Sequence, residues 1–334
     1  MKKKLAIILS LLLFPLNTYA YSSKIIPGGN TIGITVSAKG VMVVGFYKIS
    51  GKYNDATPKL KEGDYITKVN KEEVNTAEDL VKLIKKYESD KKIEISFLRN
   101  NVERSASLNL VKDNGSYKTG IYIKDEITGI GTLSYIDPET KIYGALGHEV
   151  QESTTKERMD IDDGTIFRNY ITGITRSVDG TPGSKNAKFY NNIIYGNVLK
   201  NSKFGIYGEY NEKYMKDELL EIRKLKDVKL GKAYIRTVTK GEEVKNYEIE
   251  ITNINKNSKL KSISFKVTDE KLLKESGGIV QGMSGSPIIQ DGYLIGAVTH
   301  VLVENVESGY GVSIITMLDE GDRLYEKIND QKNH

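Results

Sequence analysis

The residues best suited to chemistry lie near the carboxyl end of the chain, in a glycine-rich segment. Residues 282–287 read GMSGSP, and two apolar runs joined by Asp291-Gly292 follow them, which predicts a loop leading into a β-hairpin. A nucleophilic serine needs N–H donors aimed at its oxyanion, and flanking glycines let the backbone approach a substrate closely. The segment therefore predicts that Ser284 is a nucleophile, with the N–H groups of Gly282 and Ser284 forming the oxyanion hole.

A serine hydroxyl requires a neighbouring base, and histidine is the first candidate. The chain has three histidines, His148, His300 and His334, and the last of them is the terminal residue. His148 ends a predicted hairpin over residues 131–148, where it can reach across a cleft, so it is the expected base. His300 ends a strand-like run after Ser284 and is the alternative.

A third group must orient the imidazole and stabilise its charged form. Several aspartates lie between His148 and Ser284, and their spacing does not choose among them: Asp160, Asp162, Asp163, Asp179 and Asp269.

Composition excludes several other kinds of chemistry. The chain has no cysteine, which excludes thiolate nucleophiles, disulfides and iron–sulfur clusters. With so few histidines, we expect no metal site and no cofactor. The net charge is +5, three of those charges come from residues 2–4, and the balance elsewhere argues against a nucleic-acid partner.

The first twenty residues have the pattern of a secretory signal. Residues 2–4 are lysines, residues 5–16 are mostly apolar, and Thr18-Tyr19-Ala20 follows. The apolar run is shorter than the roughly 20 residues of a membrane span. We expect residues 1–20 to be a secretory signal peptide, with a membrane anchor over residues 5–16 as the alternative, and the remaining chain to be exported.

Residues 24–113 predict a small α+β domain. A Gly-Asp turn within residues 60–70 precedes a helix that Thr76 can cap, with Asp79 three residues on. These segments resemble the second half of a PDZ domain. The resemblance implies that Ile32, Gly33 and Ile34 form the loop whose N–H groups bind a peptide carboxylate. The alternative is a small β-rich domain that binds nothing.

Residues 118–334 predict a mainly β domain. Short strand-like runs recur after the polar segment 113–116, the best candidate for a linker, and such a series favours a barrel or a sandwich. Two stretches look helical: residues 211–228, as a solvated helix or a long connection, and residues 315–328. The segment GMSGSP is similar to the serine loop of trypsin-like peptidases, so the resemblance implies a trypsin-like β-barrel peptidase after the PDZ domain.

Three longer segments resemble the stage IV sporulation protein B peptidase family. They are GALGH at residues 144–148, GGIVQGMSGSPIIQ at 277–290 and GAVTHV at 296–301. The resemblance implies a catalytic set of His148, Asp269 and Ser284, with Asp269 assigned by the resemblance alone. An alternative role for Asp269 is to cap a helix over residues 270–274. Glu149 departs from the apolar residue expected after the histidine, and its carboxylate would raise the proton affinity of His148 or rival Asp269 as the orienting group.

The family resemblance also implies a biological role. Its members are exported into the space between the forespore and the mother cell, where they cleave themselves and a regulatory membrane protein. That cleavage leads to activation of an intramembrane protease and maturation of a sigma factor. We therefore expect protein substrates, with self-association through the PDZ domain. The alternatives are a PDZ-containing quality-control protease of the cell envelope and a non-catalytic peptide-binding adaptor.

Overall fold

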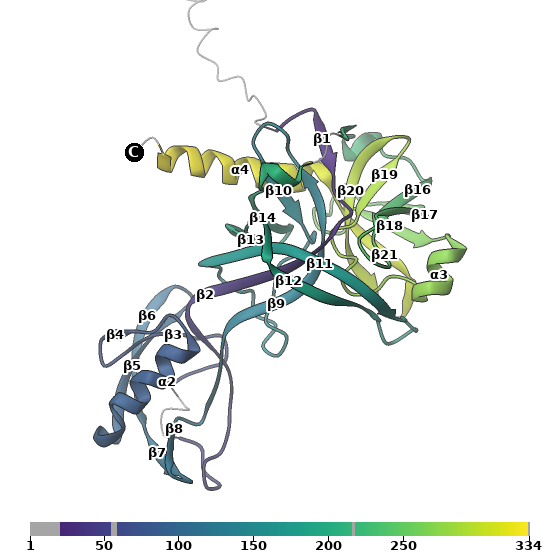
Figure 1. Ribbon diagram of the computed structural model, residues 1–334. Coiled ribbons are helices and arrows are strands. Elements are labelled where there is room, and N and C mark those ends of the chain that lie inside the picture. Colours follow the sequence, from purple (N-terminus) through teal and green to yellow (C-terminus); the bar gives the residue numbers. More distant parts are fainter. Residues whose placement is uncertain (1–20, 55–58, 216–217, 333–334) are drawn as a thin grey trace, which may run out of the picture.

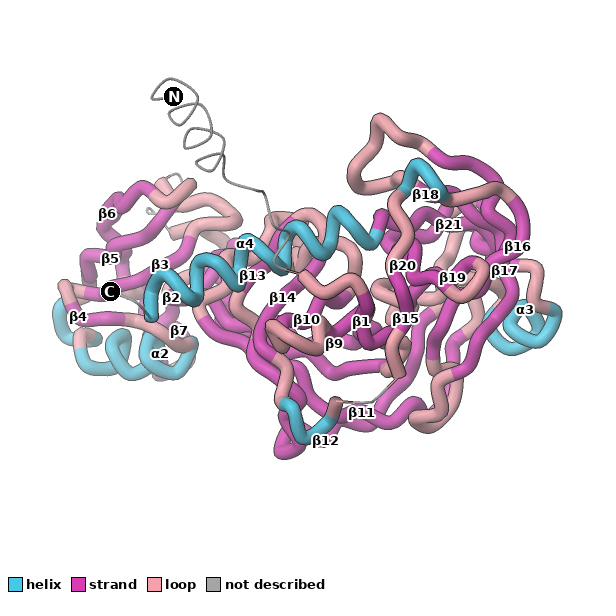
Figure 2. Tube along the Cα trace, turned by 90° about the horizontal axis from the view of Figure 1, so that it is seen from above, coloured by secondary structure: helices cyan, strands magenta, loops and turns pink. Residues whose placement is uncertain are grey.

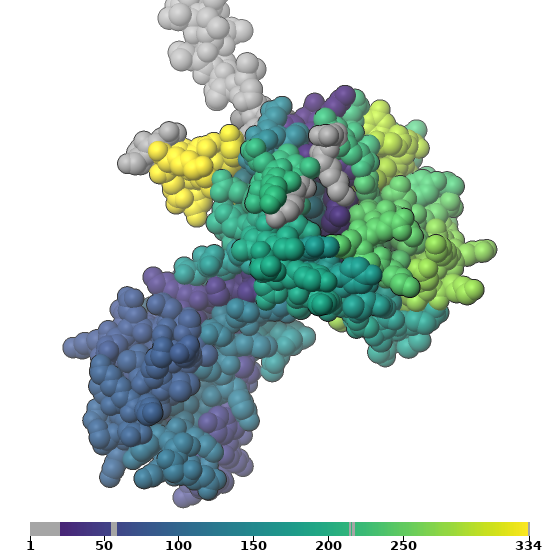
Figure 3. Space-filling view, viewed as in Figure 1, coloured from purple at the N-terminus to yellow at the C-terminus, as the bar shows by residue number. Residues whose placement is uncertain are grey.

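The computed structural model describes residues 21–54, 59–215 and 218–332. Two lobes are visible in Figure 1, a smaller one formed early in the chain and a larger one that contains the carboxyl-terminal half. Figure 3 shows them meeting at a narrower waist. The predicted signal or anchor over residues 1–20 lies outside the described residues. Within the described ranges, no helix is both long and apolar enough to span a membrane.

The smaller lobe is a sheet covered by one helix. Its own elements are β3 (Tyr65–Val69), β4 (Glu72–Glu73), α2 (Ala77–Lys86), β5 (Lys92–Arg99), β6 (Val102–Asn109) and the hairpin β7 (Val111–Asp113) with β8 (Ser116–Lys118). A short 3₁₀ helix over Glu88–Asp90 follows α2. Thr76 accepts a hydrogen bond from the backbone of Asp79, and Asp79 in turn accepts one from the backbone of Thr76, which confirms the predicted capping box. Leu80 and Leu83 of α2 are buried against the sheet, so the amphipathic face of the helix closes the core of this lobe.

The first half of the larger lobe is a strongly curved sheet. Its strands are β1 (Lys24–Pro27), β2 (Thr31–Phe46), β9 (Ile121–Ile136), β10 (Ile142–Ala145), β11 (Asp163–Thr175), β12 (Ser184–Asn197), β13 (Lys200–Ser202) and β14 (Gly205–Glu209). The order runs β12-β11-β2-β9-β10-β14, and Gly196 of β12 pairs with Tyr210 just after β14. This last pairing brings the two ends of the sheet together into a first barrel.

The second half of the larger lobe is a closed barrel of antiparallel strands. Its order is β16 (Gly231–Thr237), β17 (Lys245–Ile254), β18 (Ile263–Val267), β21 (Asn305–Ser313), β20 (Tyr293–Leu302) and β19 (Pro287–Gln290). Helix α3 (Glu270–Ser276) lies at the outer end of this barrel in Figure 1. Helix α4 (Ile314–Lys332) leaves the last strand and lies along β10 and β14 of the first barrel, as Figure 2 shows. The predicted mainly β fold, with a small α+β lobe followed by a β-barrel domain, is confirmed.

Most of the predicted local elements are present. The β9–β10 and β19–β20 hairpins form where the turn residues predicted them, and α4 includes the predicted helix over 315–328. The helix predicted over residues 211–228 was wrong. Its described residues form 3₁₀ helices at Glu212–Tyr214 and Leu225–Asp227 and the short strand β15 (Leu220–Glu221). Leu220 pairs with Ile25 of β1 and packs into the core beneath α4, so tertiary pairing overrides the local helical preference.

The strand β2 belongs to both lobes, which changes the expected division of the chain. Its residues 31–37 pair with β9 and β11 of the first barrel, whereas Val41 and Met42 pair with β3 of the smaller lobe. Strand β1 also pairs within the larger lobe. Residues 24–37, which the sequence assigned to the PDZ domain, therefore complete the first barrel in space. The chain crosses the waist on β2 and returns on β9.

Candidate active site

Ser284 lies in the loop between α3 and β19, and strand β9 of the first barrel holds this loop from the other side. Thr132 of β9 donates its hydroxyl to the Gly282 carbonyl at 2.7 Å and its N–H to the Ser284 carbonyl at 2.9 Å. Ser134 donates its hydroxyl to the Gly285 carbonyl at 2.8 Å. The loop is thus fixed between the two barrels rather than by its own strand alone.

The glycines of this loop are required by close approach and by backbone conformation. Gly285 has φ +92°, and a Cβ there would lie 2.0 Å from the Thr132 carbonyl oxygen. Gly282 has φ +94°, a region that side chains other than glycine rarely adopt. Neither Gly282 nor Ser284 donates its N–H to another group within the described ranges. Both N–H groups are therefore able to serve as the oxyanion donors that the sequence predicts.

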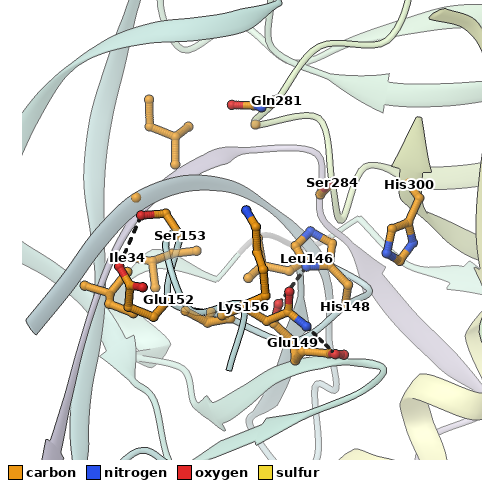
Figure 4. Close-up of a pocket in the computed structure, with 16 residues that line it drawn as sticks. Ile34, Leu146, His148, Glu149, Glu152, Ser153, Lys156, Gln281, Ser284 and His300 are labelled. Atoms are coloured by element: carbon orange, nitrogen blue, oxygen red, sulfur yellow. Dashed lines mark hydrogen bonds between the residues drawn. The ribbon is translucent and has the colours of Figure 1, made fainter. Parts of the chain in front are cut away.

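His148 lines the same pocket as Ser284. Its Nδ1 lies 2.8 Å from the main-chain oxygen of Glu149, so Nδ1–H donates to that carbonyl and Nε2 is left as the proton acceptor. In Figure 4 the other ring nitrogen points toward Ser284. The Ser284 hydroxyl itself donates to the Thr299 carbonyl at 3.1 Å. The predicted nucleophile and base thus face each other without a hydrogen bond between them in this resting arrangement.

His300 also lines the pocket, and its ring centroid lies 5.5 Å from that of His148. Burial, together with the neighbouring His148, lowers the pKa of His300 to about 4. The Thr299 hydroxyl is in hydrogen-bond contact with Nδ1 of His300. Burial also lowers the pKa of His148, although the Glu149 carbonyl and carboxylate act in the opposite direction. Glu149 therefore raises proton affinity as expected, but burial outweighs it, and both rings are neutral at pH 7.

The structure does not bring Asp269 into this site. Its Oδ1 accepts the N–H of Leu272 at 2.9 Å, and its Oδ2 lies 3.3 Å from the N–H of Glu248. Asp269 is the N-cap of α3, so the alternative role holds and the catalytic assignment was wrong for this arrangement. The Asp269 carboxylate is bonded to the N-terminus of α3 on the second barrel, and it does not line the pocket beside His148.

No other carboxylate replaces Asp269 within the part of the chain that the structure describes. Asp179 accepts the N–H of Val306, and Asp160 pairs with Arg158. Carboxylates lining the pocket come from Glu149 and Glu152, and neither bonds to a histidine ring. The imidazole is oriented by a main-chain carbonyl instead. The described residues also contain no cluster of histidine, aspartate or glutamate that could hold a metal ion.

Two residues near the site were not singled out by their sequence context. Glu152 follows His148 in a loop over residues 149–162; its side chain is fully buried, accepts the N–H groups of Thr154 and Thr155, and pairs with Lys124 at 2.8 Å. Lys185 is buried beside Gly282 and donates to the hydroxyls of two threonines. Nothing in the pattern of either segment distinguishes these residues from surface charges.

The predicted carboxylate-binding loop at Ile32, Gly33 and Ile34 was wrong. These residues lie inside β2, with β9 paired along one edge and β11 along the other. Both edges are therefore occupied, and no peptide can be added as a further strand there. A Cβ at Gly33 would lie 2.2 Å from the ring of Phe167, which explains the glycine by packing. Ile34 instead contributes to the wall of the pocket beside Ser284.

Comparison with known proteins gives a family match for each of the two lobes. The family model described as SpoIVB peptidase S55 matches residues 115–318, and that of the PDZ domain matches residues 31–110. The search of curated proteins gave no match.

Solved structures give only distant similarity. The active form of the Rv3671c protease from M. tuberculosis is 12% identical over 57% of this chain and 71% of that chain, with a TM-score of 0.33. Its inactive form is 11% identical over 59% of this chain and 84% of that chain, with a TM-score of 0.31. The two barrels of this chain are defined by its own strand pairing.

Proposed function

Because the chain belongs to the SpoIVB peptidase S55 family and is a PDZ-containing serine peptidase, we propose that Ser284 is its nucleophile and His148 its base. The observation that carries this assignment is the shared pocket, in which the free Nε2 of His148 faces Ser284 beside two uncommitted N–H groups. His300 lines the pocket as well, but Thr299 occupies its Nδ1 and its pKa of about 4 makes it the weaker base.

The proposed reaction begins when the Ser284 hydroxyl leaves the Thr299 carbonyl and turns to Nε2 of His148. Its oxygen attacks the scissile carbonyl carbon while Nε2 takes the proton, and the N–H groups of Gly282 and Ser284 bind the oxyanion. The imidazolium then gives that proton to the departing amine, leaving an acyl-enzyme. Water, deprotonated by the same nitrogen, hydrolyses the ester and restores the hydroxyl.

The Glu149 carbonyl replaces a carboxylate in this scheme. By accepting Nδ1–H it holds the ring in the tautomer that leaves Nε2 free, which is the orienting role of the third member of a triad. The carboxylate of Glu149 adds negative charge close to the imidazolium.

The biological role that we propose is that of the family resemblance. The protein is exported into the space between forespore and mother cell, either released from its leader or anchored by residues 5–16. There it cleaves itself and a membrane-bound regulatory protein, which activates an intramembrane protease and leads to sigma-factor maturation. The PDZ domain supplies self-association. The family match, the sequence of the leader and the accessible Ser284–His148 pocket support this proposal.

Self-cleavage of the purified chain tests the assignment. Wild type, Ser284→Ala and Ser286→Ala are incubated separately and their fragments identified by mass spectrometry. Ser286 is the matched control because it lies in the same loop, is fully buried, and its hydroxyl has no hydrogen-bond partner among the described residues. We expect fragments from wild type and Ser286→Ala and none from Ser284→Ala, because loss of a nucleophile costs a factor on the order of 10⁶ in turnover. Equal cleavage in the Ser284 variant would falsify the mechanism.

Adding wild type to the Ser284→Ala chain then asks whether cleavage occurs between molecules. Defined fragments of the inactive chain support self-recognition. Rapid, non-selective degradation of unfolded casein by the same enzyme would favour the quality-control role over signalling.

A further inference from the structure

A hollow of about 500 Å³ opens beside Ser284 and extends well beyond the two histidines. Its volume lies within the range of small-ligand pockets, which bury most of the group they bind. One wall comes from the first barrel and the other from the loop over residues 149–162 and the segment before Ser284. The hollow therefore joins the reaction site to residues 127–130 of β9.

The wall formed by the first barrel is apolar. It is built from aliphatic side chains and one glycine of β2, β9 and the position directly after β10: Ile34, Ile127, Gly129, Ile130 and Leu146. Charged side chains enter from the opposite loop, among them Glu149 and Lys156. An apolar wall that opens to solvent gains free energy when an apolar side chain covers it, at about 25 cal/mol for each Å² removed from water.

The strand that carries this wall has an unused edge. Residues 127–132 of β9 pair with β2 on one side. On the other side β9 pairs with β10 only from Leu133 onward. Next to that pairing, Thr132 accepts the N–H of Leu146 and donates its own N–H to the Ser284 carbonyl. Within the described ranges, no strand covers the second edge of residues 127–131. An extended chain whose scissile bond lies at Ser284 can therefore continue along this edge by strand addition.

We propose that this hollow is the subsite that selects the substrate: it binds a bulky aliphatic or aromatic side chain next to the scissile bond, with the substrate backbone alongside residues 127–131. Ile127, Gly129 and Ile130 determine the size of the side chain that fits. The proposal rests on the assignment of Ser284 as nucleophile.

The two glycines Gly129 and Gly173 provide a matched test. Each lies in a strand of the first barrel, neither has a positive φ, and a Cβ added to either meets no atom within 4 Å. Gly129 lines the hollow, whereas Gly173 lies near the far end of β11, outside the lining. A leucine at either position is therefore compatible with the backbone, but only Gly129→Leu narrows the subsite.

The experiment profiles cleavage of a synthetic peptide mixture in which each position around the scissile bond is varied. We expect wild type and Gly173→Leu to prefer a large apolar residue at one position. Gly129→Leu should shift that preference to alanine or glycine and lower kcat/KM for the bulky peptides by roughly tenfold or more, since one methylene is worth about 10–200-fold in such a pocket. Ile127→Ala, which removes rather than adds volume, should extend the preference to larger side chains.

A small fluorophosphonate that reacts with the activated serine separates this inference from the mechanism. We expect Ser284-dependent labelling in wild type and in all three variants, at the wild-type rate in the control Gly173→Leu. Normal labelling with an unchanged preference in both Gly129→Leu and Ile127→Ala, or a wild-type preference for charged residues, would overturn the subsite and leave the nucleophile intact. Absence of Ser284-dependent labelling in wild type would instead overturn the proposed function.

Discussion

Two loops meet at the pocket, and different parts of the chain hold them. The carbonyls of the serine loop over residues 277–286 accept one main-chain N–H and two hydroxyls from the neighbouring strand β9, and its glycines adopt conformations that they alone accept readily. The histidine loop over residues 146–162 is held by side chains from distant parts of the chain. Asn201 donates to the carbonyls of Val150 and Met159, and Lys124 pairs with the buried Glu152.

The histidine loop also extends to the smaller lobe. The Asp160 N–H lies 3.3 Å from the hydroxyl of Tyr65 in β3, and a Cβ on Gly63 would lie 3.1 Å from Glu157. Within the described ranges, the serine loop has no such contact. Ser284, the proposed nucleophile, is therefore positioned by the interface between the two barrels, whereas the position of His148, the proposed base, depends on contacts that span both lobes.

The largest effect on turnover should come from replacing His148, with His300 as the comparison. His148→Ala should lower turnover by a factor on the order of 10⁶, as loss of one member of a serine–base unit does, whereas His300→Ala should retain substantial turnover. Peptide cleavage rates at saturating substrate measure both. The reverse ranking would exchange their roles and place the base on β20.

The pH dependence of turnover sharpens the same assignment. Since burial lowers the pKa of His148 below its ordinary value of 6.5, the base stays neutral to lower pH than a free imidazole would. Activity should therefore persist at pH 6.5 and decline only below it. Titration of kcat against pH measures this limb, and a midpoint above 6.5 would contradict a buried, carbonyl-held imidazole.

Next comes the buried anchor of the histidine loop. Glu152→Gln removes the charge that pairs with Lys124 and replaces one of the two acceptor oxygens by an amide group. A buried donor is then left without an acceptor, which should lower folding stability by about 1–3 kcal/mol. The His148 loop should loosen, so kcat should fall by roughly 10- to 100-fold, the loss that a small misplacement of reacting groups can cause. Glu149→Gln, whose side chain contacts Gln151 near the surface, is the control and should change less.

Stability measured against pH identifies the charge as the cause. Burial raises the pKa of Glu152, but the Lys124 amine and two backbone N–H groups together outweigh it and lower that pKa to about 2, from 4.5 for a free carboxyl. A depressed folded-state pKa contributes stability above pH 4.5 that is lost as the pH falls toward 2. The difference in unfolding free energy between wild type and Glu152→Gln should therefore shrink over that window. A difference that stays constant there would assign the loss to packing.

Lys185 is the corresponding test on the serine side. Its amine donates to the hydroxyls of Thr31 and Thr237, one from each barrel, and its stem packs beside Gly282. Burial lowers its pKa to about 7, from 10.5. Between these values the unfolded chain binds a proton that the folded chain does not, so burial of this amine costs stability that is regained as the pH rises from 7 to 10.5.

Lys185→Met keeps the stem and removes the titration. Wild type should gain stability relative to this variant by about 1.4 kcal/mol per pH unit between pH 7 and 10.5, measured by urea unfolding at pH 7, 8 and 9. Turnover should fall modestly because the link between the barrels beside the oxyanion hole is lost. Parallel stability curves for the two proteins would show that the amine is solvated and charged throughout.

The smallest effect should come from Asp269. Asparagine caps a helix about as well as aspartate, so Asp269→Asn should leave both stability and turnover near wild type, and Asp269→Ala should cost about 1 kcal/mol. Denaturation and peptide cleavage on the same preparations measure the two quantities. A turnover loss approaching 10⁴ in a folded Asp269→Asn protein would restore its catalytic assignment and imply a rearrangement that brings α3 to the pocket.

Local chemistry made much of this molecule predictable. The Asp291-Gly292 turn, the Thr76 capping box and the glycine-rich serine loop depend on residues a few positions apart, and they formed where the sequence indicated. His148 was favoured by elimination among three histidines and by the hairpin that it follows. Such features depend on backbone conformations that only certain residue types adopt, and short segments of sequence record them directly.

The sequence by itself determined which reactive groups the chain contains: a serine among glycines, a histidine beyond a hairpin and no thiol. Only the tertiary structure decided which of the candidate residues lie together and what each of them contacts. It placed Ile32–Ile34 between two strands, committed Asp269 to a helix terminus, and gave the orienting role at His148 to a main-chain carbonyl. It also buried Glu152 and Lys185 behind the two loops. These outcomes depend on strand partners and side chains brought from distant parts of the chain, and local residue types do not encode which distant groups will meet.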